Sequence, residues 1–273
     1  MAGVSIIREL VVNTPECDLG GKTALIVGIA NEHSLAWAAA ERFHRAGARL
    51  AITYLNDKAR THVEPLAERV GAELLLECDV TQAGGLEAVF EAVKAKWGKL
   101  DLAFHAIASA PLSDLQGRLT DCSAQGFASA MTVSCHSLLR MARLAEPLMH
   151  KGGSLTTLSF YGAEKVVDHY NLMGPVKAAL ESAVRYLAHE LGPANIRVNA
   201  ISAGPVATRA ASGLIHFEEL LTEAANKSPL RRTVDASEVG KAALFLASDL
   251  ASGVTGEILH VDAGFHVNAM VFH

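Results

Sequence analysis

The sequence predicts an α/β fold, a single doubly wound domain in which helices cover both faces of a seven-stranded parallel sheet. Two observations lead to this prediction. Short apolar runs alternate along the chain with longer stretches of helical periodicity, which is the pattern of successive βαβ units. No low-complexity linker or internal repeat divides the 273 residues, and open α/β sheets of this length commonly form one domain.

Each strand is predicted from a short, mainly apolar run, and most helices from the longer amphipathic stretch that follows one. The first strand, residues 23–27, ends at Gly28, and the next helix begins near the N-cap residue Ser34 and stops at Gly47. The remaining strands are expected at residues 49–54, 73–77, 100–108, 154–159, 196–202 and 257–261. The helices are expected at residues 34–46, 58–70, 86–97, 124–150, 176–191 and 238–248.

Composition narrows the classes of function. Apolar residues make up 50% of the chain and charged residues 19%, as in a soluble globular protein. The net charge of -5 argues against a nucleic-acid binder, which needs a basic surface. The four cysteines form no CxxC pair and match no zinc spacing, so we expect reduced thiols, no metal site and a cytoplasmic location. No run of about 18 apolar residues predicts a membrane span, and residues 1–20 are interpreted as an N-terminal extension rather than a signal peptide.

The loop after the first strand is a candidate phosphate-binding turn. Gly28 would let the backbone approach a pyrophosphate, Ser34 would cap the following helix, and the amide of Leu35 would face the phosphates. Ala30 stands where a GxGxxG motif would place its second glycine, so the local pattern fits a plain strand–helix turn equally well. The position on the first strand of an alternating α/β chain favours dinucleotide binding.

Two further strand ends carry candidate cofactor contacts. After the third strand, Asp79 could accept a hydrogen bond from an adenine amino group while Val80 packs against the ring. Asp79 could instead, or also, cap a helix starting near residue 81. After the fourth strand, Ala106 is small enough for the chain to pass beneath a ribose, although ordinary strand packing would also explain it.

The end of the second strand usually distinguishes NAD from NADP in such sheets, through an acidic residue or an arginine respectively. Asp57 could bind a ribose hydroxyl, whereas Lys58 and Arg60 could bind a 2′-phosphate. These residues by themselves leave both NADH and NADPH open.

Two tyrosine–lysine pairs after the fifth strand compete for a catalytic role. Tyr161 and Lys165 have the YxxxK spacing of short-chain dehydrogenases, and Tyr170 and Lys177 are seven residues apart. Steps of four and seven residues turn about 400° and about 700°, so either pair would share one face of a helix. Tyr170 and Lys177 lie at the start of the stronger helical pattern, where Pro175 is tolerated if it falls in the first turn. We therefore favour Tyr170 and Lys177.

A tyrosine and a lysine suit the chemistry of a nicotinamide-dependent reductase. Hydride transfer to a substrate leaves negative charge on an oxygen, which a tyrosine hydroxyl can stabilise as a hydrogen-bond donor. A nearby lysine ammonium supports that donor and can bind the nicotinamide ribose. Taken singly, Lys177 could be a solvated helix charge and Tyr170 a packing aromatic.

At these residues the chain resembles the enoyl-acyl-carrier-protein reductases, a divergent branch of the short-chain dehydrogenases with a Rossmann fold. The resemblance extends from about residue 21 to about residue 270. The motifs that carry it are Tyr170 and Lys177 separated by six residues, Ser159-Phe160 upstream, Cys78-Asp79-Val80, the stretch from Arg197 to Pro205, Pro229 to Thr233, and His260-Val261-Asp262.

This resemblance implies hydride transfer from NADH, or from NADPH, to C3 of a trans-2-enoyl thioester on acyl carrier protein, in fatty acid biosynthesis. It implies that Tyr170 bonds the thioester oxygen and that Lys177 holds the ribose. It also implies a homotetramer and a mobile substrate lid over residues 208–226. Further residues that it places at the cofactor are Pro205, Val206 and Thr208, and those on the substrate side are Phe160, Tyr161 and Met173.

Departures from the family pattern keep two other functions open. Phe160 stands where relatives often carry a second tyrosine, and Ala108 replaces a usual glycine. A short-chain dehydrogenase acting on a carbonyl or an alcohol is the first alternative, and it would use either tyrosine–lysine pair. A cofactor-binding regulator without activity is the second, which the intact Tyr170 and Lys177 disfavour.

Overall fold

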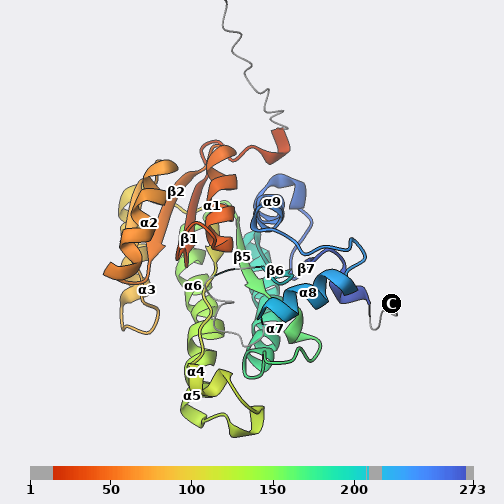
Figure 1. Cartoon of the computed structure of the whole chain (residues 1–273). Coiled ribbons are helices and arrows are strands. Elements are labelled where there is room, and N and C mark those ends of the chain that lie inside the picture. Colours follow the sequence, from red (N-terminus) through yellow and green to blue (C-terminus); the bar gives the residue numbers. More distant parts are fainter. Residues whose placement is uncertain (1–14, 207, 209–216, 269–273) are drawn as a thin grey trace, which may run out of the picture.

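The computed structural model describes residues 15–206, 208 and 217–268, and Figure 1 shows its course. Its centre is a seven-stranded parallel sheet with the strand order β3-β2-β1-β4-β5-β6-β7. The predicted fold class is therefore confirmed. The strands are β1 (Thr23–Val27), β2 (Arg49–Tyr54), β3 (Leu74–Glu77), β4 (Leu102–His105), β5 (Gly153–Ser159), β6 (Ile196–Ala203) and β7 (Ile258–Val261).

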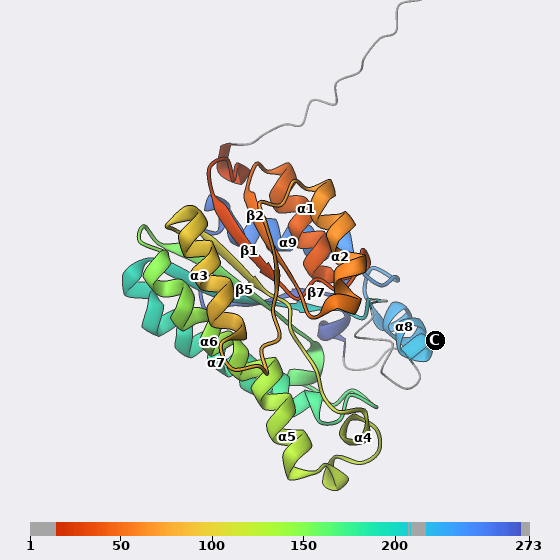
Figure 2. The same cartoon turned by 90° about the vertical axis from the view of Figure 1, so that its left-hand side faces the viewer.

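Helices pack on both faces of the sheet because alternate strand residues point to opposite sides. Ala24 and Ile26 of β1 belong to one apolar cluster, and Leu25 and Val27 belong to another. The first cluster lies beneath α1 (Leu35–Arg45), α2 (Asp57–Arg69) and α9 (Ala236–Ala247). The second lies beneath α3 (Gly85–Trp97), α6 (Ser137–Ala145) and α7 (Met173–Leu191), and Figure 2 shows the two groups on either side of the strands.

The fourth strand is shorter than the predicted range 100–108. Pairing with β1 ends at His105, with one further backbone bond from the amide of Ala106 to the carbonyl of Val27 at 2.9 Å. Beyond it the amide of Ser109 donates to the hydroxyl of Ser134 rather than to a neighbouring strand. The chain therefore leaves the sheet at this point and runs over its carboxyl edge.

The single helix predicted at residues 124–150 is interrupted. The structure divides this range into α5 (Ala124–Met131), a π-helical turn (Thr132–His136), α6 and a 3₁₀ turn (Glu146–Leu148). Serine hydroxyls bond within and beside the π-helical turn: Ser137 donates to the carbonyl of Val133 at 2.6 Å, and Ser134 donates to the carbonyl of Ser109. Such side-chain bonds compete with the regular helical pattern.

The remaining helices differ from the prediction mainly at their ends. Helix α7 begins at Met173 rather than at residue 176, so Pro175 lies in its first turn, where no helical bond from its nitrogen is needed. In the part of the chain that the structure describes, two α-helices were not predicted, α4 (Leu112–Leu115) and α8 (Phe217–Lys227). Among the described residues, no helix has the length and apolar character needed to cross a membrane.

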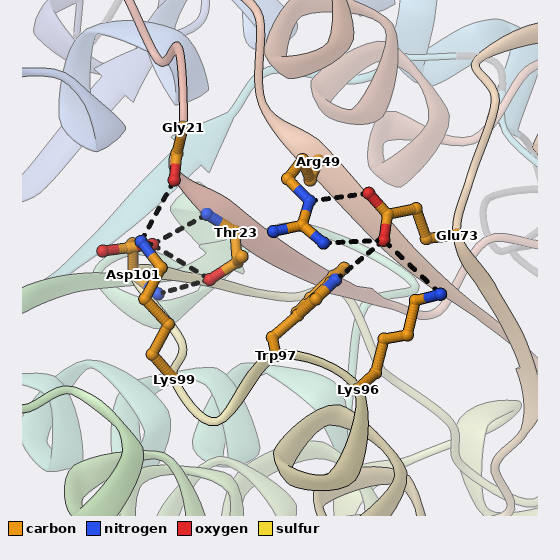
Figure 3. Close-up of polar contacts among 8 residues, drawn as sticks. All are labelled: Gly21, Thr23, Arg49, Glu73, Lys96, Trp97, Lys99 and Asp101. Atoms are coloured by element: carbon orange, nitrogen blue, oxygen red, sulfur yellow. Dashed lines mark hydrogen bonds and ion pairs between the residues drawn. The ribbon is translucent and has the colours of Figure 1, made fainter.

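A polar network joins the strands at their amino ends, opposite the edge where ligands bind in such sheets. Figure 3 shows Glu73, just before β3, accepting from Arg49 Nε at 2.6 Å and from Trp97 Nε1 at 3.0 Å. Asp101, just before β4, accepts from the amide and the hydroxyl of Thr23 at 2.8 and 2.9 Å. These groups connect neighbouring strands and leave the carboxyl edge to the candidate site.

Candidate functional site

The end of β1 approaches the end of β4 too closely for a side chain to fit between them. Gly28 has φ of +107°, and a Cβ built on it would lie 2.2 Å from the carbonyl oxygen of Ala106. The predicted role of Gly28 as a position without a side chain therefore has a clear physical basis. A backbone cradle of this kind, next to the start of α1, fits the pyrophosphate of a dinucleotide.

Ser34 occupies the N-cap position of α1, as predicted, but its hydroxyl does not cap the helix. It donates instead to the carbonyl of Asn31 at 2.6 Å and so stabilises the loop between Gly28 and α1. The prediction that Ser34 caps the helix is wrong in this respect. Leu35 is the first residue of α1, and this first turn has no side-chain cap, which keeps its amides suited to an anion.

Asp79 closes a tight turn after β3. Its Oδ1 accepts from the amide of Thr81 at 2.9 Å and from the Thr81 hydroxyl at 2.7 Å. Because α3 begins only at Gly85, Asp79 does not cap that helix, and this alternative is wrong. The side chain of Val80 is buried in the apolar cluster beneath α3, and its carbonyl accepts from Arg140 Nη1 at 2.7 Å.

Tyr170 lies in the turn that leads into α7, not in the helix itself, so the expected helical pairing with Lys177 is wrong in detail. The residues on either side have left-handed backbones, with φ of 64° at His169 and 38° at Asn171. The side-chain amide of Asn171 donates to the carbonyls of Leu115 and Gly117 at 2.9 and 2.7 Å. The turn is thereby tied to the segment that follows β4.

The ring of Tyr170 is held between two residues that follow β5. Its centroid lies 4.7 Å from that of the Phe160 ring, in an edge-on arrangement. A Cβ on Gly162 would lie 2.4 Å from Cδ1 of Tyr170, so the ring rests directly on the glycine backbone. Burial, followed by the charge of Glu181, raises the pKa of Tyr170 above its ordinary value. The phenol is therefore protonated at neutral pH and available as a donor.

Lys177 projects from α7 to the end of β5. Only 5% of the residue is exposed, and its Nζ donates to the carbonyl of Leu158 at 2.8 Å. Burial lowers the pKa of Lys177 to about 8, while the carboxylate of Glu181 acts in the opposite direction. The turn before α7 places Tyr170 against Phe160, just after β5, and the first turns of α7 place Lys177 at Leu158 of β5, so both residues of the favoured pair lie at the same end of this strand.

The competing pair is directed elsewhere. Tyr161 begins a 3₁₀ turn (Tyr161–Ala163), and its hydroxyl donates to the carbonyl of His266 at 3.3 Å. Its ring packs edge-on against Phe265, with 5.5 Å between centroids. The side chain of Lys165 is exposed. Tyr161 therefore contacts the C-terminal segment, and Lys165 faces solvent.

His105 was not assigned a role from the sequence. It ends β4 and is fully enclosed, with Nδ1 2.9 Å from the hydroxyl of Thr157 and Nε2 2.7 Å from that of Ser137. Burial, aided by the charge of Lys177, lowers the pKa of His105 to about 3, so the ring is neutral. A histidine within an apolar strand needs polar partners when buried, and that was the available sequence signal.

The other predicted residues are described only in part. Pro205 is buried and Val206 is half-buried after β6, and Thr208 is also half-buried. Met173 opens α7 and packs in a small apolar cluster with Leu115. Of the proposed lid at residues 208–226, the structure describes residue 208 and the part within α8; residues 209–216 lie outside the described residues.

A doubly wound parallel sheet with a backbone cradle after β1, and with a buried lysine and a tyrosine that both contact the end of β5 or the residue after it, is the framework of Rossmann-type, nicotinamide-dependent oxidoreductases. Comparison with known proteins makes the assignment specific. Residues 28–266 match the family model described as Enoyl-(Acyl carrier protein) reductase. The chain belongs to the enoyl-acyl-carrier-protein reductase family, as the sequence motifs predicted.

Individual relatives resemble nearly the whole chain. The enoyl-acyl-carrier-protein reductase (NADH) 1 of Rhizobium meliloti is 49% identical over 252 residues, which cover 92% of this chain and 93% of the relative. The reductase of Anaplasma phagocytophilum, solved in complex with NAD, superposes with a TM-score of 0.89 at 49% identity over 92% of this chain and 96% of its own. The Bacillus cereus reductase, solved with NADP+ and an indole naphthyridinone, superposes with a TM-score of 0.90 at 45% identity. The match covers 92% of this chain and 99% of the Bacillus cereus chain.

Proposed function

We infer that this chain reduces the C2–C3 double bond of a trans-2-enoyl thioester carried by acyl carrier protein, a step of fatty acid biosynthesis. The observation that carries this inference is the placement of Tyr170 and of the buried Lys177 at the carboxyl edge of the sheet in a chain of this family. When bound, the reduced nicotinamide supplies the hydride that is added to C3.

Residues of the chain would bind the cofactor and stabilise the charge that develops on the substrate. The cradle at Gly28 and the first turn of α1, near Ser34 and Leu35, would bind the pyrophosphate. Lys177 would hold the nicotinamide ribose. Tyr170 would donate a hydrogen bond to the thioester oxygen, where negative charge develops as the enolate forms, before C2 takes up a proton.

Other contacts complete the proposed site. Asp79, Val80 and Ala106 would line the adenosine half of the cofactor. Pro205, Val206 and Thr208 would follow the nicotinamide and pyrophosphate. Phe160, Tyr161 and Met173 would face the acyl substrate, although the Tyr161 hydroxyl is bonded to His266 in this structure. Residues 208–226 would form the lid.

NADH is the proposed reductant in preference to NADPH. At the end of β2 the guanidinium of Arg60 is already paired with Glu64 at 2.9 Å and lies over the ring of Tyr54. The side-chain oxygen of Asn56 accepts from the amide of Ala59 at 3.0 Å. The arginine that could receive a 2′-phosphate therefore has another partner, which weakens the case for NADPH.

We also propose that the protein acts as a homotetramer in the cytoplasm. Large apolar side chains are exposed on α5 and α6, with Phe127 42% and Leu139 39% accessible. Contact between copies of the chain would cover such surface.

The assay that tests the function compares substrates and reductants in the same cuvette. We expect NADH to be oxidised in the presence of crotonyl thioester, more slowly or not at all with NADPH, and not with simple ketones. Loss of absorbance at the nicotinamide band measures the rate. Turnover of ketones without thioesters would assign the chain to carbonyl reduction instead, and cofactor binding without any turnover would point to a regulator.

A Gly162→Ala variant is expected to lower kcat by roughly ten- to a hundredfold, because the new methyl group must displace the ring of Tyr170. The measurement is kcat for crotonyl thioester alongside the thermal midpoint. Gly192→Ala is the matched control, since no atom lies within 4 Å of a Cβ at that position. Equal kcat values for the two variants would show that the glycine does not position the tyrosine.

A further inference from the structure

Two side chains from one face of α7 bond two consecutive residues at the end of β5. Lys177 Nζ donates to the carbonyl of Leu158 at 2.8 Å. Four residues further along α7, Glu181 Oε1 accepts from the hydroxyl of Ser159 at 2.5 Å. Residues four apart in a helix are neighbours on one face. The Ser159–Glu181 bond therefore fixes the strand end whose carbonyl receives the lysine.

Glu181 is unusual because its carboxyl group is buried. Only 5% of the residue is exposed, and a buried carboxylate is costly unless cations and hydrogen bonds compensate for lost water. Burial raises the pKa of Glu181, while the Ser159 bond lowers it. The charged or titratable groups facing it are Lys177 and Arg185 of α7, Tyr170 before α7, His260 of β7 and Glu164 after the 3₁₀ turn.

We propose that Glu181 is a positioning residue, which holds the Lys177 ammonium charged and in place at the end of β5 and thereby supports the donor Tyr170. This inference rests on the proposed function only in taking Lys177 and Tyr170 as the working pair. Glu181 itself would touch neither substrate nor cofactor. Its two contributions are separable: the hydrogen bond to Ser159 fixes geometry, and the negative charge favours the ammonium.

The direction in which the Glu181 charge shifts the pKa of Lys177 can be predicted. Burial of Lys177 favours its neutral amine, and the Glu181 carboxylate favours the ammonium. Removing the carboxylate leaves burial unopposed, so Lys177 would lose its proton at lower pH. The other group that acts on Lys177 is Cys135 of the π-helical turn. His105 of β4 feels the charge of Lys177 and is itself neutral. Neither replaces the missing negative charge at neutral pH, because burial also raises the pKa of the Cys135 thiol.

The test uses Glu181→Gln, whose amide oxygen can still accept from Ser159 but carries no charge. Both the NADH affinity and kcat/KM for crotonyl thioester are measured against pH. Both the NADH affinity and kcat/KM are expected to fall as the pH rises, because Lys177 loses its proton. In Glu181→Gln this fall is expected at a pH lower by about one unit. Lys177→Met should abolish the fall in NADH affinity, which assigns it to this lysine.

Companion variants separate charge from geometry. Ser159→Ala keeps the carboxyl group but removes its hydrogen bond, so kcat should drop by roughly tenfold from misplacement, while the fall with pH should move less than it does in Glu181→Gln. Glu190→Gln, an exposed substitution on the same helix, should leave both quantities unchanged. Thermal midpoints show whether each variant folds. If Glu181→Gln does not fold, the test passes to Glu181→Asp, which keeps the charge. That variant must fold and retain the wild-type pH dependence.

The proposal would be overturned if folded Glu181→Gln kept both the wild-type pH dependence and the wild-type kcat. It would also be overturned if Glu181→Asp folded but showed the fall at the lower pH expected for Glu181→Gln. The NADH titration needs no turnover. A wild-type protein that binds NADH but does not reduce thioesters would therefore refute the proposed function while still reporting on Glu181.

Discussion

A Tyr170→Phe variant is expected to lose about 10²–10⁴-fold in kcat for crotonyl thioester while binding NADH with unchanged affinity. The substitution removes only the hydroxyl. The ring would keep its edge-on contact with Phe160 and its place against Gly162. Because burial raises the pKa of Tyr170, the hydroxyl is present as a neutral donor, and no second phenol stands at position 160 to replace it.

Steady-state kinetics and a fluorescence titration with NADH would test this prediction. Tyr186→Phe is the matched control, because that phenol is 70% exposed on α7. Full activity in Tyr170→Phe would remove Tyr170 from the mechanism. If Tyr161→Phe instead lost the activity, the pair formed by Tyr161 and Lys165 would become the working assignment.

The second large effect is expected from Gly28→Ala. Its methyl group would lie 2.2 Å from the carbonyl oxygen of Ala106, and φ of +107° is a conformation that residues with a side chain rarely adopt. The ends of β1 and β4 must separate, which displaces the proposed cofactor cradle. We expect kcat/KM for NADH to fall by about 10²-fold and the free energy of unfolding to fall by about 1–3 kcal/mol.

The control for backbone strain alone is Gly71→Ala. Gly71 also has a positive φ, +54°, but no atom lies within 4 Å of a Cβ built there. This variant should lose some stability and keep its NADH kinetics. If Gly28→Ala bound NADH as well as Gly71→Ala does, the approach of β1 and β4 would not be the cofactor cradle.

Where the sequence pattern failed, contacts from elsewhere in the chain had overridden it. The alternation of apolar runs and amphipathic stretches predicted all seven strands, and residues 23–27 and 49–54 match β1 and β2 at both ends. The prediction for β4 ran too long because Ser109 bonds to Ser134 instead of a strand. The long helix at 124–150 was interrupted where Ser134, in the π-helical turn, bonds to the backbone of Ser109.

By itself, the sequence determined the fold class, because periodicity and turn residues are local properties of a chain, and it favoured Tyr170 and Lys177 through their place at the start of a strong helical pattern. Only the tertiary structure decided which residues around this pair bond to one another. His105 meets Thr157 across 52 positions, and Ser159 meets Glu181 across 22. Burial also lowers the pKa of Lys177 to about 8, and burial depends on how distant segments pack.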